Sequence, residues 1–241
     1  MVTLTIDGLK IQAEAGTTIM EAAGAHNIYI PSLCHHEAVT PYGACRLCLV
    51  EIERNGRRQV VTSCIYLVAE GMVVRTTTDE IIETRQVIME LLVSRCPDSE
   101  VIQDLARQLG VSKSPFPKER GHNKCILCAL CVRTCQEVVG AAALSFVNRG
   151  VDREMAIPFY EDSEACIACG SCAFVCPTHA IQMKDTGGKR VITQPHDRME
   201  FKLKKCSVCG DYWAPEKQLD YFVSKYNLDP HIFDTCPYCR D

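Results

Sequence analysis

The 241-residue sequence lacks the features of several protein classes. It has no apolar run long enough to span a bilayer. Its first eight residues show no basic segment followed by an apolar stretch, so no secretory signal is predicted. A formal net charge of −4 offers no electrostatic argument for binding nucleic acid or anionic membranes. We therefore expect a cytoplasmic protein with no transmembrane segment and no nucleic-acid partner.

Motifs for nucleotide binding and for hydrolysis are also missing. No GxGxxG sequence opens a strand–helix unit, no P-loop lysine motif appears, and no Ser/His/Asp or paired-carboxylate arrangement stands out. The chain is therefore not expected to bind a nicotinamide or a flavin, or to carry a catalytic site of its own. Such chemistry would have to take place on other subunits.

What the sequence does contain is 17 cysteines. In a small secreted protein that number would indicate disulfides, but in the reducing cytoplasm it indicates metal sites. Many of the cysteines lie three positions apart, a spacing that brings thiolates together around a tight turn. Twelve of them have spacings suited to one 2Fe–2S cluster and two 4Fe–4S clusters.

The first group of four lies in residues 1–78, which have the pattern of a β-rich domain with one helix. Its members are Cys34, Cys45, Cys48 and Cys64. A 2Fe–2S cluster needs two thiolates on each iron, and a long loop can supply three of the four while a later strand end supplies the last. Buried structural cysteines and a zinc site are the alternatives, although structural zinc favours two close pairs.

Turn and helix signals around these cysteines predict the local structure. Asp7–Gly8 and Asn55–Gly56 are typical of hairpin turns, and Thr17–Thr18 can cap a helix that begins at Ile19. Residues 79–121 are expected to form a helical spacer and a linker. The apolar faces predicted for its two helices are Ile82, Val87, Ile88, Leu91 and Leu92, then Val101, Ile102, Leu105 and Leu109.

Residues 122–186 contain two copies of one cysteine motif, separated by a stretch that should add a hairpin or a helix. Three cysteines at this spacing wrap one corner of a cubane, and in two-cluster ferredoxins the fourth ligates the other cluster. One 4Fe–4S cluster is therefore assigned to Cys125, Cys128, Cys131 and Cys176. The other is assigned to Cys135, Cys166, Cys169 and Cys172.

Residues 187–241 hold two CxxC pairs on either side of a helix-like stretch, Glu216 to Tyr226. The pairs are Cys206 with Cys209 and Cys236 with Cys239. Four thiolates in two pairs match a tetrahedral structural zinc site, which predicts a zinc-ribbon-like domain. A further iron–sulfur cluster and a single rubredoxin-like iron are the alternatives. The seventeenth cysteine, Cys96, is expected to be a partly buried thiol at a helix end.

Over roughly residues 1 to 185, the order of these motifs resembles the N-terminal part of the large iron–sulfur subunit of respiratory complex I. The stretch from Cys125 to Gly140, CILCALCVRTCQEVVG, carries much of the likeness. The chain is most similar to the small diaphorase subunit of NAD(P)-linked hydrogenases, including electron-bifurcating ones. The resemblance implies an α+β chain with a β-grasp plant-type ferredoxin domain, a helical spacer and a bacterial-type two-4Fe–4S ferredoxin domain, followed here by the zinc-ribbon-like segment.

The resemblance also implies an electron-relay role. Single electrons would pass between a flavin subunit that binds NAD(P) and a catalytic subunit such as a hydrogenase, with a thioredoxin-like 2Fe–2S subunit as a further partner. A free-standing soluble carrier is the alternative, as is a relay subunit of a formate dehydrogenase or of a ferredoxin:NAD(P) oxidoreductase.

The sequence departs from this family in two places. Many relatives hold an additional 4Fe–4S cluster with one histidine and three cysteines, but here the matching stretch, Leu91 to Pro97, keeps only Cys96. Loss of that cluster is expected. The C-terminal segment with its two CxxC pairs is the second departure, because relatives usually lack it.

Overall fold

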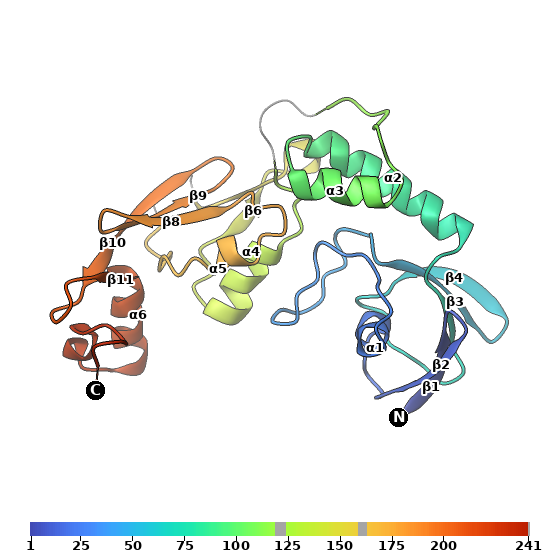
Figure 1. Cartoon of the computed structure of the whole chain (residues 1–241), viewed down its shortest axis with the longest axis horizontal. Helices are drawn as coiled ribbons and strands as arrows, with labels where there is room; N and C mark the ends of the chain where they lie inside the picture. Colours follow the sequence, from blue (N-terminus) through green and yellow to red (C-terminus); the bar gives the residue numbers. More distant parts are fainter. Residues whose placement is uncertain (119–123, 159–162, 241) are drawn as a thin grey trace. The chain divides into compact units, whose positions relative to one another are not determined.

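The computed structural model describes residues 1–118, 124–158 and 163–240. It consists of two compact units, Met1–Ala129 and Leu130–Asp241 (Figure 1). None of the helices in the described residues is long and apolar enough to cross a membrane. The predicted domain boundary between residues 121 and 122 lies outside the described residues.

The first unit contains a five-stranded mixed sheet with the order β2-β1-β5-β3-β4. Strands β1 and β5 are parallel and the other neighbours are antiparallel. Both expected hairpins are confirmed, and the residues of their two-residue turns, Asp7–Gly8 and Asn55–Gly56, all have positive φ, as type I′ turns require. The strands are β1 (Val2–Ile6), β2 (Leu9–Ala13), β3 (Leu49–Arg54), β4 (Arg57–Thr62) and β5 (Val73–Arg75).

Helix α1 (Ile19–Ala25) packs against this sheet and begins at the predicted cap. The Glu21 N–H donates to Thr18 Oγ1 (3.2 Å), and the Thr18 N–H donates to Glu21 Oε2 (2.8 Å), which forms a capping box. Two predicted cluster ligands, Cys48 and Cys64, belong to the hydrophobic core of this domain. That core contains Leu4, Ile6, Ile11, Ala13, Ile19, Ala22, Ala23, Ile30, Cys48, Val50, Ile52, Cys64, Val68, Met72 and Val74.

The helical spacer consists of α2 (Asp79–Arg95) and α3 (Glu100–Gln108), whose N-termini are capped by Thr78 and Ser99. The predicted apolar face of α2 was wrong. Three of its members are between 42% and 50% exposed, namely Ile82, Val87 and Leu91. Four of the five buried residues instead recur every four positions, namely Ile81, Arg85, Met89 and Val93, and the fifth is Ser94. The prediction failed because it followed the aliphatic side chains, whereas the buried face includes an arginine.

The second unit begins with short helices that carry cluster cysteines. Helix α4 (Leu130–Arg133) continues into a π-helical turn, η1 (Thr134–Val139), which ends at Gly140 with φ +78. π-Helical turns are frequent at functional sites. Helix α5 (Ser171–Phe174) carries part of the second motif. Between them the chain forms a hairpin, one of the two elements expected there, with β6 (Ser145–Val147), a single turn η2 (Gly150–Asp152) and β7 (Glu154–Ala156).

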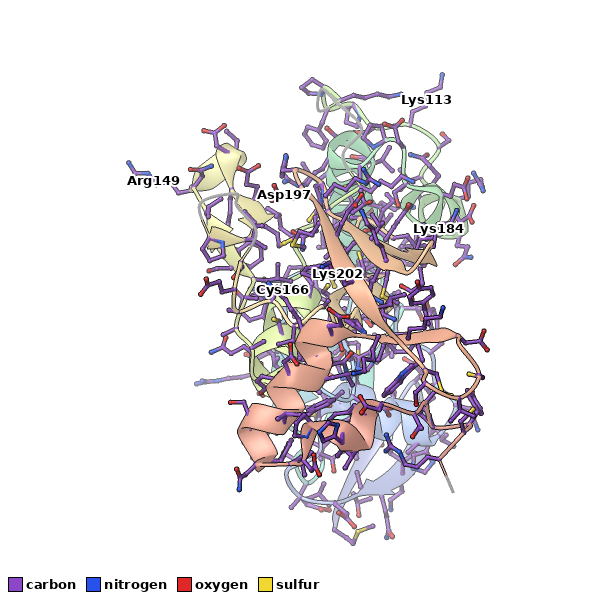
Figure 2. The ribbon with its side chains drawn as sticks, turned by 90° about the vertical axis from the view of Figure 1, so that its left-hand side faces the viewer. Lys113, Arg149, Cys166, Lys184, Asp197 and Lys202 are labelled. Atoms are coloured by element: carbon purple, nitrogen blue, oxygen red, sulfur yellow. The ribbon has the colours of Figure 1, made fainter. Side chains whose placement is uncertain are left out.

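A four-stranded antiparallel sheet of order β11-β10-β9-β8 follows. Side chains alternate along β10, so Met199 and Phe201 are buried whereas Lys202, labelled in Figure 2, is exposed. Ile192, Met199 and Phe201 join the core that surrounds the cysteines. The predicted boundary after residue 186 therefore falls at the tip of the β8–β9 hairpin. The strands are β8 (Gln182–Thr186), β9 (Lys189–Thr193), β10 (Arg198–Lys205) and β11 (Tyr212–Pro215).

Helix α6 (Glu216–Tyr226) has the bounds that the sequence predicted, and it lies against β10 and β11. Asn227, in a left-handed conformation, ends the helix. A final turn, η4 (Pro230–Phe233), leads into the last CxxC pair.

Candidate iron–sulfur and metal centres

The first group of cysteines is buried and its members contact one another in two pairs. Each of Cys34, Cys45, Cys48 and Cys64 is at most 9% exposed. The Sγ atoms of Cys48 and Cys64 are 3.4 Å apart, and the Cys45 N–H donates to Cys34 Sγ at 3.3 Å. Two thiolate pairs are what the two irons of a 2Fe–2S cluster require.

The loop around these sulfurs is shaped to hold thiolates. Arg46 is in a left-handed conformation with φ +60, and the Leu33 N–H donates to Cys45 Sγ at 3.4 Å. The hydrogen bond between the Cys48 and Cys64 thiols lowers the pKa of Cys48 to about 7 and raises the pKa of Cys64. The contact with Cys34 likewise raises the pKa of Cys45. Thiolate is the form that binds metal, so one thiol ionises readily and the others ionise when metal cations supply the compensating charge.

The two copies of the 4Fe–4S motif share an unusual backbone conformation. The residues just before and just after the second cysteine of each copy have positive φ: Leu127 (53) and Ala129 (66) in one, Ala168 (59) and Gly170 (79) in the other. A left-handed conformation costs a residue with a Cβ atom about 1–2 kcal/mol. Repetition of this strain at equivalent positions is typical of a backbone held in place for a ligand.

A cavity in the second unit brings Cys135 of the first motif together with three cysteines of the second. Cys135, Cys166, Cys169 and Cys172 all line it, with Cys166 labelled in Figure 2. Burial raises the pKa of Cys172 to about 12 and raises the pKa values of Cys135 and Cys166. Four thiols in such a cavity ionise when metal cations supply the compensating charge.

The other 4Fe–4S set is divided between the two units. Cys125 and Cys128 lie in Met1–Ala129, where the Arg95 Nε donates to the Cys125 carbonyl at 3.1 Å. Cys131 and Cys176 lie in the second unit, where the Ala180 N–H donates to Cys176 Sγ at 3.2 Å. Their assignment to a single cluster stays a prediction.

An orphaned hydroxyl near the cysteines fits an iron–sulfur cluster. Thr134 Oγ1, between Cys131 and Cys135 in sequence, is buried and has no hydrogen-bond partner among the described residues. Buried polar groups normally have a partner. Cluster sulfurs accept hydrogen bonds, so this hydroxyl can donate one there. Gln194, whose side chain lines the cavity, has an Oε1 atom that is likewise unpartnered within the described residues, but this atom is an acceptor and requires a donor instead.

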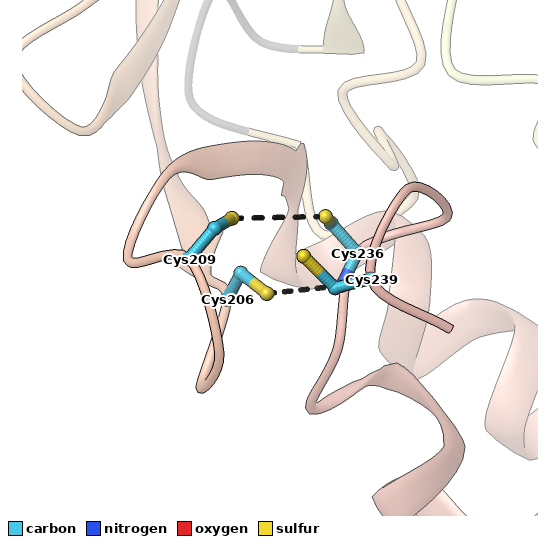
Figure 3. A group of neighbouring side chains, drawn as sticks. All are labelled: Cys206, Cys209, Cys236 and Cys239. Atoms are coloured by element: carbon cyan, nitrogen blue, oxygen red, sulfur yellow. Dashed lines mark hydrogen bonds between the residues drawn. The ribbon is translucent and has the colours of Figure 1, made fainter. Parts of the chain in front are cut away.

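The C-terminal cysteines gather around a single point (Figure 3). The Sγ atoms of Cys206, Cys209, Cys236 and Cys239 all lie within 4.8 Å of one another, with 3.8 Å between those of Cys209 and Cys236. Thiolates around one tetrahedral zinc ion, each about 2.3 Å from the metal, are about 3.8 Å from one another. This spacing favours one metal ion over an iron–sulfur cluster, whose several irons hold their thiolates farther apart.

One cysteine of the C-terminal group, Cys206, ionises more readily than an ordinary thiol. The Cys236 N–H donates to Cys206 Sγ at 3.3 Å, and this hydrogen bond lowers the pKa of Cys206 to about 6. Cys206 and Cys236 are each 3% exposed, whereas Cys209 is exposed. A metal ion bound by these four thiols would therefore lie near the surface of the unit.

Cys96 lies at the C-terminal end of α2, where its N–H donates to the Leu92 carbonyl at 2.8 Å. Its side chain is fully buried, more so than expected. The predicted loss of the additional cluster in this region stays a prediction.

Two residues near the candidate centres were missed from the sequence. Gln194 carries no recognisable signal, because its approach to the cavity depends on how β9 and β10 fold back. Arg85 does carry one, since it lies at four-residue spacing from Ile81 and Met89 on a helix.

Comparison with known proteins establishes the cluster types. A 2Fe–2S iron–sulfur cluster binding domain matches residues 1–79, and a 4Fe–4S dicluster domain matches residues 124–180. The prediction of one 2Fe–2S and two 4Fe–4S clusters is thereby confirmed. Residues 181–241, with the C-terminal cysteines, lie outside both matches.

Relatives over most of the chain establish the family. An NADH-quinone oxidoreductase subunit of Rhizobium meliloti (strain 1021) is 38% identical over 207 residues, 75% of this chain and 24% of that protein. The NADP-reducing hydrogenase subunit HndD of Solidesulfovibrio fructosivorans is 35% identical over 212 residues, covering 75% and 36%. A solved NAD+-reducing NiFe hydrogenase in the H2-reduced state matches with a TM-score of 0.57 and 31% identity, over 65% of this chain and 75% of that one.

The chain belongs to the family of ferredoxin-type iron–sulfur subunits of NAD(P)-linked oxidoreductases. This iron–sulfur subunit spans about a quarter to a third of the length of the curated relatives just described. The predicted resemblance is thereby confirmed.

Proposed function

We propose that this iron–sulfur subunit is the electron relay of a multi-subunit NAD(P)-linked complex whose catalytic module is a hydrogenase. The observation that carries the proposal is the combination, in one chain, of a 2Fe–2S domain with a 4Fe–4S dicluster domain. When bound, such clusters take up and release single electrons. The nucleotide-binding motifs that would let the chain handle NAD(P) itself are missing from its sequence.

The chain's own residues hold the clusters and exclude water from them. Cys34, Cys45, Cys48 and Cys64 would hold the 2Fe–2S cluster inside the first unit's core, where their burial supports this assignment. Cys135, Cys166, Cys169 and Cys172 would hold one 4Fe–4S cluster in the cavity that they line. Cys125, Cys128, Cys131 and Cys176 would hold the other. Backbone N–H groups that donate to Sγ atoms stabilise the thiolates.

In this proposal the chain exchanges electrons with other subunits and carries no substrate site of its own. Its partners are a flavin subunit that binds NAD(P), a thioredoxin-like 2Fe–2S subunit and the hydrogenase, in the cytoplasm. The likeness to an NADP-reducing hydrogenase subunit and to an NAD+-reducing hydrogenase supports this assembly. A tagged chain in its native cell should co-purify with a flavin-containing subunit, and purification as a lone monomer would contradict the proposal.

The C-terminal segment is proposed to be a zinc-ribbon-like domain whose ion is structural. The single-ion spacing of its sulfurs supports zinc over a fourth iron–sulfur cluster. Metal and sulfide analysis of the purified chain tests both assignments together, with an expected content of about ten irons and about one zinc per chain. A content of about fourteen irons without zinc would overturn the zinc assignment.

A further inference from the structure

Arg85 occupies an uncommon position for an arginine, in the middle of the buried face of α2. The other residues at the same four-residue spacing are apolar: Ile81, Met89 and Val93. Arg85 is only 4% exposed, and burial lowers its pKa, yet arginine remains protonated in proteins. A positive charge is therefore held inside the first unit, which is unfavourable unless negative groups compensate for it.

The Arg85 guanidinium reaches the backbone on both sides of a candidate cluster ligand. Its Nε donates to the Leu47 carbonyl at 2.9 Å, and its Nη2 donates to the Leu49 carbonyl at 2.7 Å. These two carbonyls flank Cys48. Within the described residues both side-chain hydrogen bonds go to neutral carbonyls and no carboxylate forms a salt bridge with the guanidinium. The charges of Cys48 and Asp7 act from farther away and only partly offset the effect of burial on the Arg85 pKa.

A 2Fe–2S cluster held by Cys48 would add a larger negative charge than these groups provide. Four thiolates and two sulfides outweigh two ferric ions, so the cluster is anionic, and one-electron reduction adds a further negative charge. The attraction between a buried cation and this charge is stronger than in water because the effective dielectric constant is lower. The cation therefore stabilises the reduced cluster more than the oxidised one.

We infer that Arg85 is a positioning residue that braces the backbone around Cys48 and raises the midpoint potential of the 2Fe–2S cluster. The inference rests on the proposed 2Fe–2S site at Cys34, Cys45, Cys48 and Cys64. Arg85 itself lies beyond residues 1–79, which the 2Fe–2S domain matches. A helix of the spacer thus contributes to a cluster in the neighbouring domain.

The test measures the midpoint potential of the 2Fe–2S signal by EPR-monitored redox titration of the full chain with its clusters. Arg85→Met removes the charge and keeps much of the aliphatic volume, whereas Arg85→Lys keeps the charge but loses the forked geometry. We expect Arg85→Met to lower the equilibrium constant for one-electron reduction at least tenfold, a shift of about 59 mV to lower potential. Arg85→Lys should recover most of that shift.

Arg75→Met is the matched control. Arg75 lies on β5, which pairs with β3, but its side chain is 35% exposed and pairs with Glu51 (2.8 Å) and Glu53 (3.0 Å). Its charge is already compensated and partly screened by water, so its replacement should leave the potential unchanged.

An unshifted potential in Arg85→Met would overturn the inference, and so would equal shifts in the Met and Lys variants, since bracing alone would then explain them. If Arg85→Met does not take up the cluster, Arg85→Gln serves as the neutral variant, because its amide can still donate to one carbonyl. Failure of both neutral variants to bind the cluster would leave a purely structural role and also overturn the inference. A wild-type chain without a 2Fe–2S signal would instead contradict the proposed function.

Discussion

Two groups of four cysteines in this chain differ in what surrounds them. Cys34, Cys45, Cys48 and Cys64 lie inside or beside a large aliphatic core between α1 and a five-stranded sheet. The C-terminal group lies on the loops that follow β10 and η4, and the buried residue of the neighbouring helix α6 is Leu219. A hydrophobic core fixes the positions of the first four cysteines, whereas few buried apolar side chains surround the C-terminal four.

The difference teaches which site depends on its metal. A segment that cannot bury enough apolar surface needs a metal or another cross-link to stay folded. In structural zinc sites, metal binding and folding are coupled, so removal of the ion unfolds the segment. We therefore expect the N-terminal sheet to persist without its cluster and the C-terminal segment to unfold without its ion.

The largest expected effect is that of Cys206→Ser in the C-terminal group. Loss of one thiolate should abolish zinc binding, and residues 206–239 should lose their fixed structure. Metal analysis and amide hydrogen exchange of α6 check this. Ser207→Ala, beside the ligand but with an exposed side chain, should retain both zinc and protection. If the amides of α6 stay protected from exchange in the zinc-free Cys206→Ser chain, the C-terminal segment does not depend on its ion and the proposed difference between the two sites is wrong.

A smaller but substantial effect is expected for Ile52→Ala in the N-terminal core. Ile52 is fully buried, so truncation should lower the free energy of unfolding of the first unit by about 2–5 kcal/mol. Val60→Ala on the adjacent strand β4, where the side chain is 37% exposed, should cost about 0.5 kcal/mol or less. Denaturant unfolding measures both, and similar losses would mean that the core does not place this site.

Thr18→Ala should weaken the same unit by less. The substitution removes the side-chain acceptor of the capping box, which is typically worth about 1 kcal/mol. Thr17→Ala, one residue earlier and outside the capping box, serves as the control. Thermal unfolding should give a lower melting temperature for the Thr18 variant than for the Thr17 variant. Equal melting temperatures would show that the cap contributes little.

The smallest expected effect on the backbone is that of Cys34→Ser. The variant should lose the 2Fe–2S signal and about two irons per chain. The hydrophobic core does not need the cluster, so amide protection of β1 and β3 should survive. Unfolding of the sheet together with cluster loss would show that both four-cysteine groups depend on metal, and the contrast would fail.

Local elements were predictable because their causes are local. The hairpins at Asp7–Gly8 and Asn55–Gly56 follow from residues that adopt positive φ, and the bounds of α6 follow from its periodicity between two CxxC pairs. The metal of the C-terminal group was left open between zinc, a further iron–sulfur cluster and a single rubredoxin-like iron, because spacing in sequence does not determine the distances between sulfurs. Those distances required the folded chain.

By itself, the sequence determined the cluster types, because cysteines a few positions apart meet around one turn whatever the rest of the chain does. Only the tertiary structure decided which face of α2 is buried, that β9 and β10 complete the core around the second motif, and that Arg85 reaches the backbone beside Cys48. Arg85 and its two acceptors are 38 and 36 positions apart in sequence. Contacts over such separations depend on how whole elements pack, and no short pattern of residues encodes them.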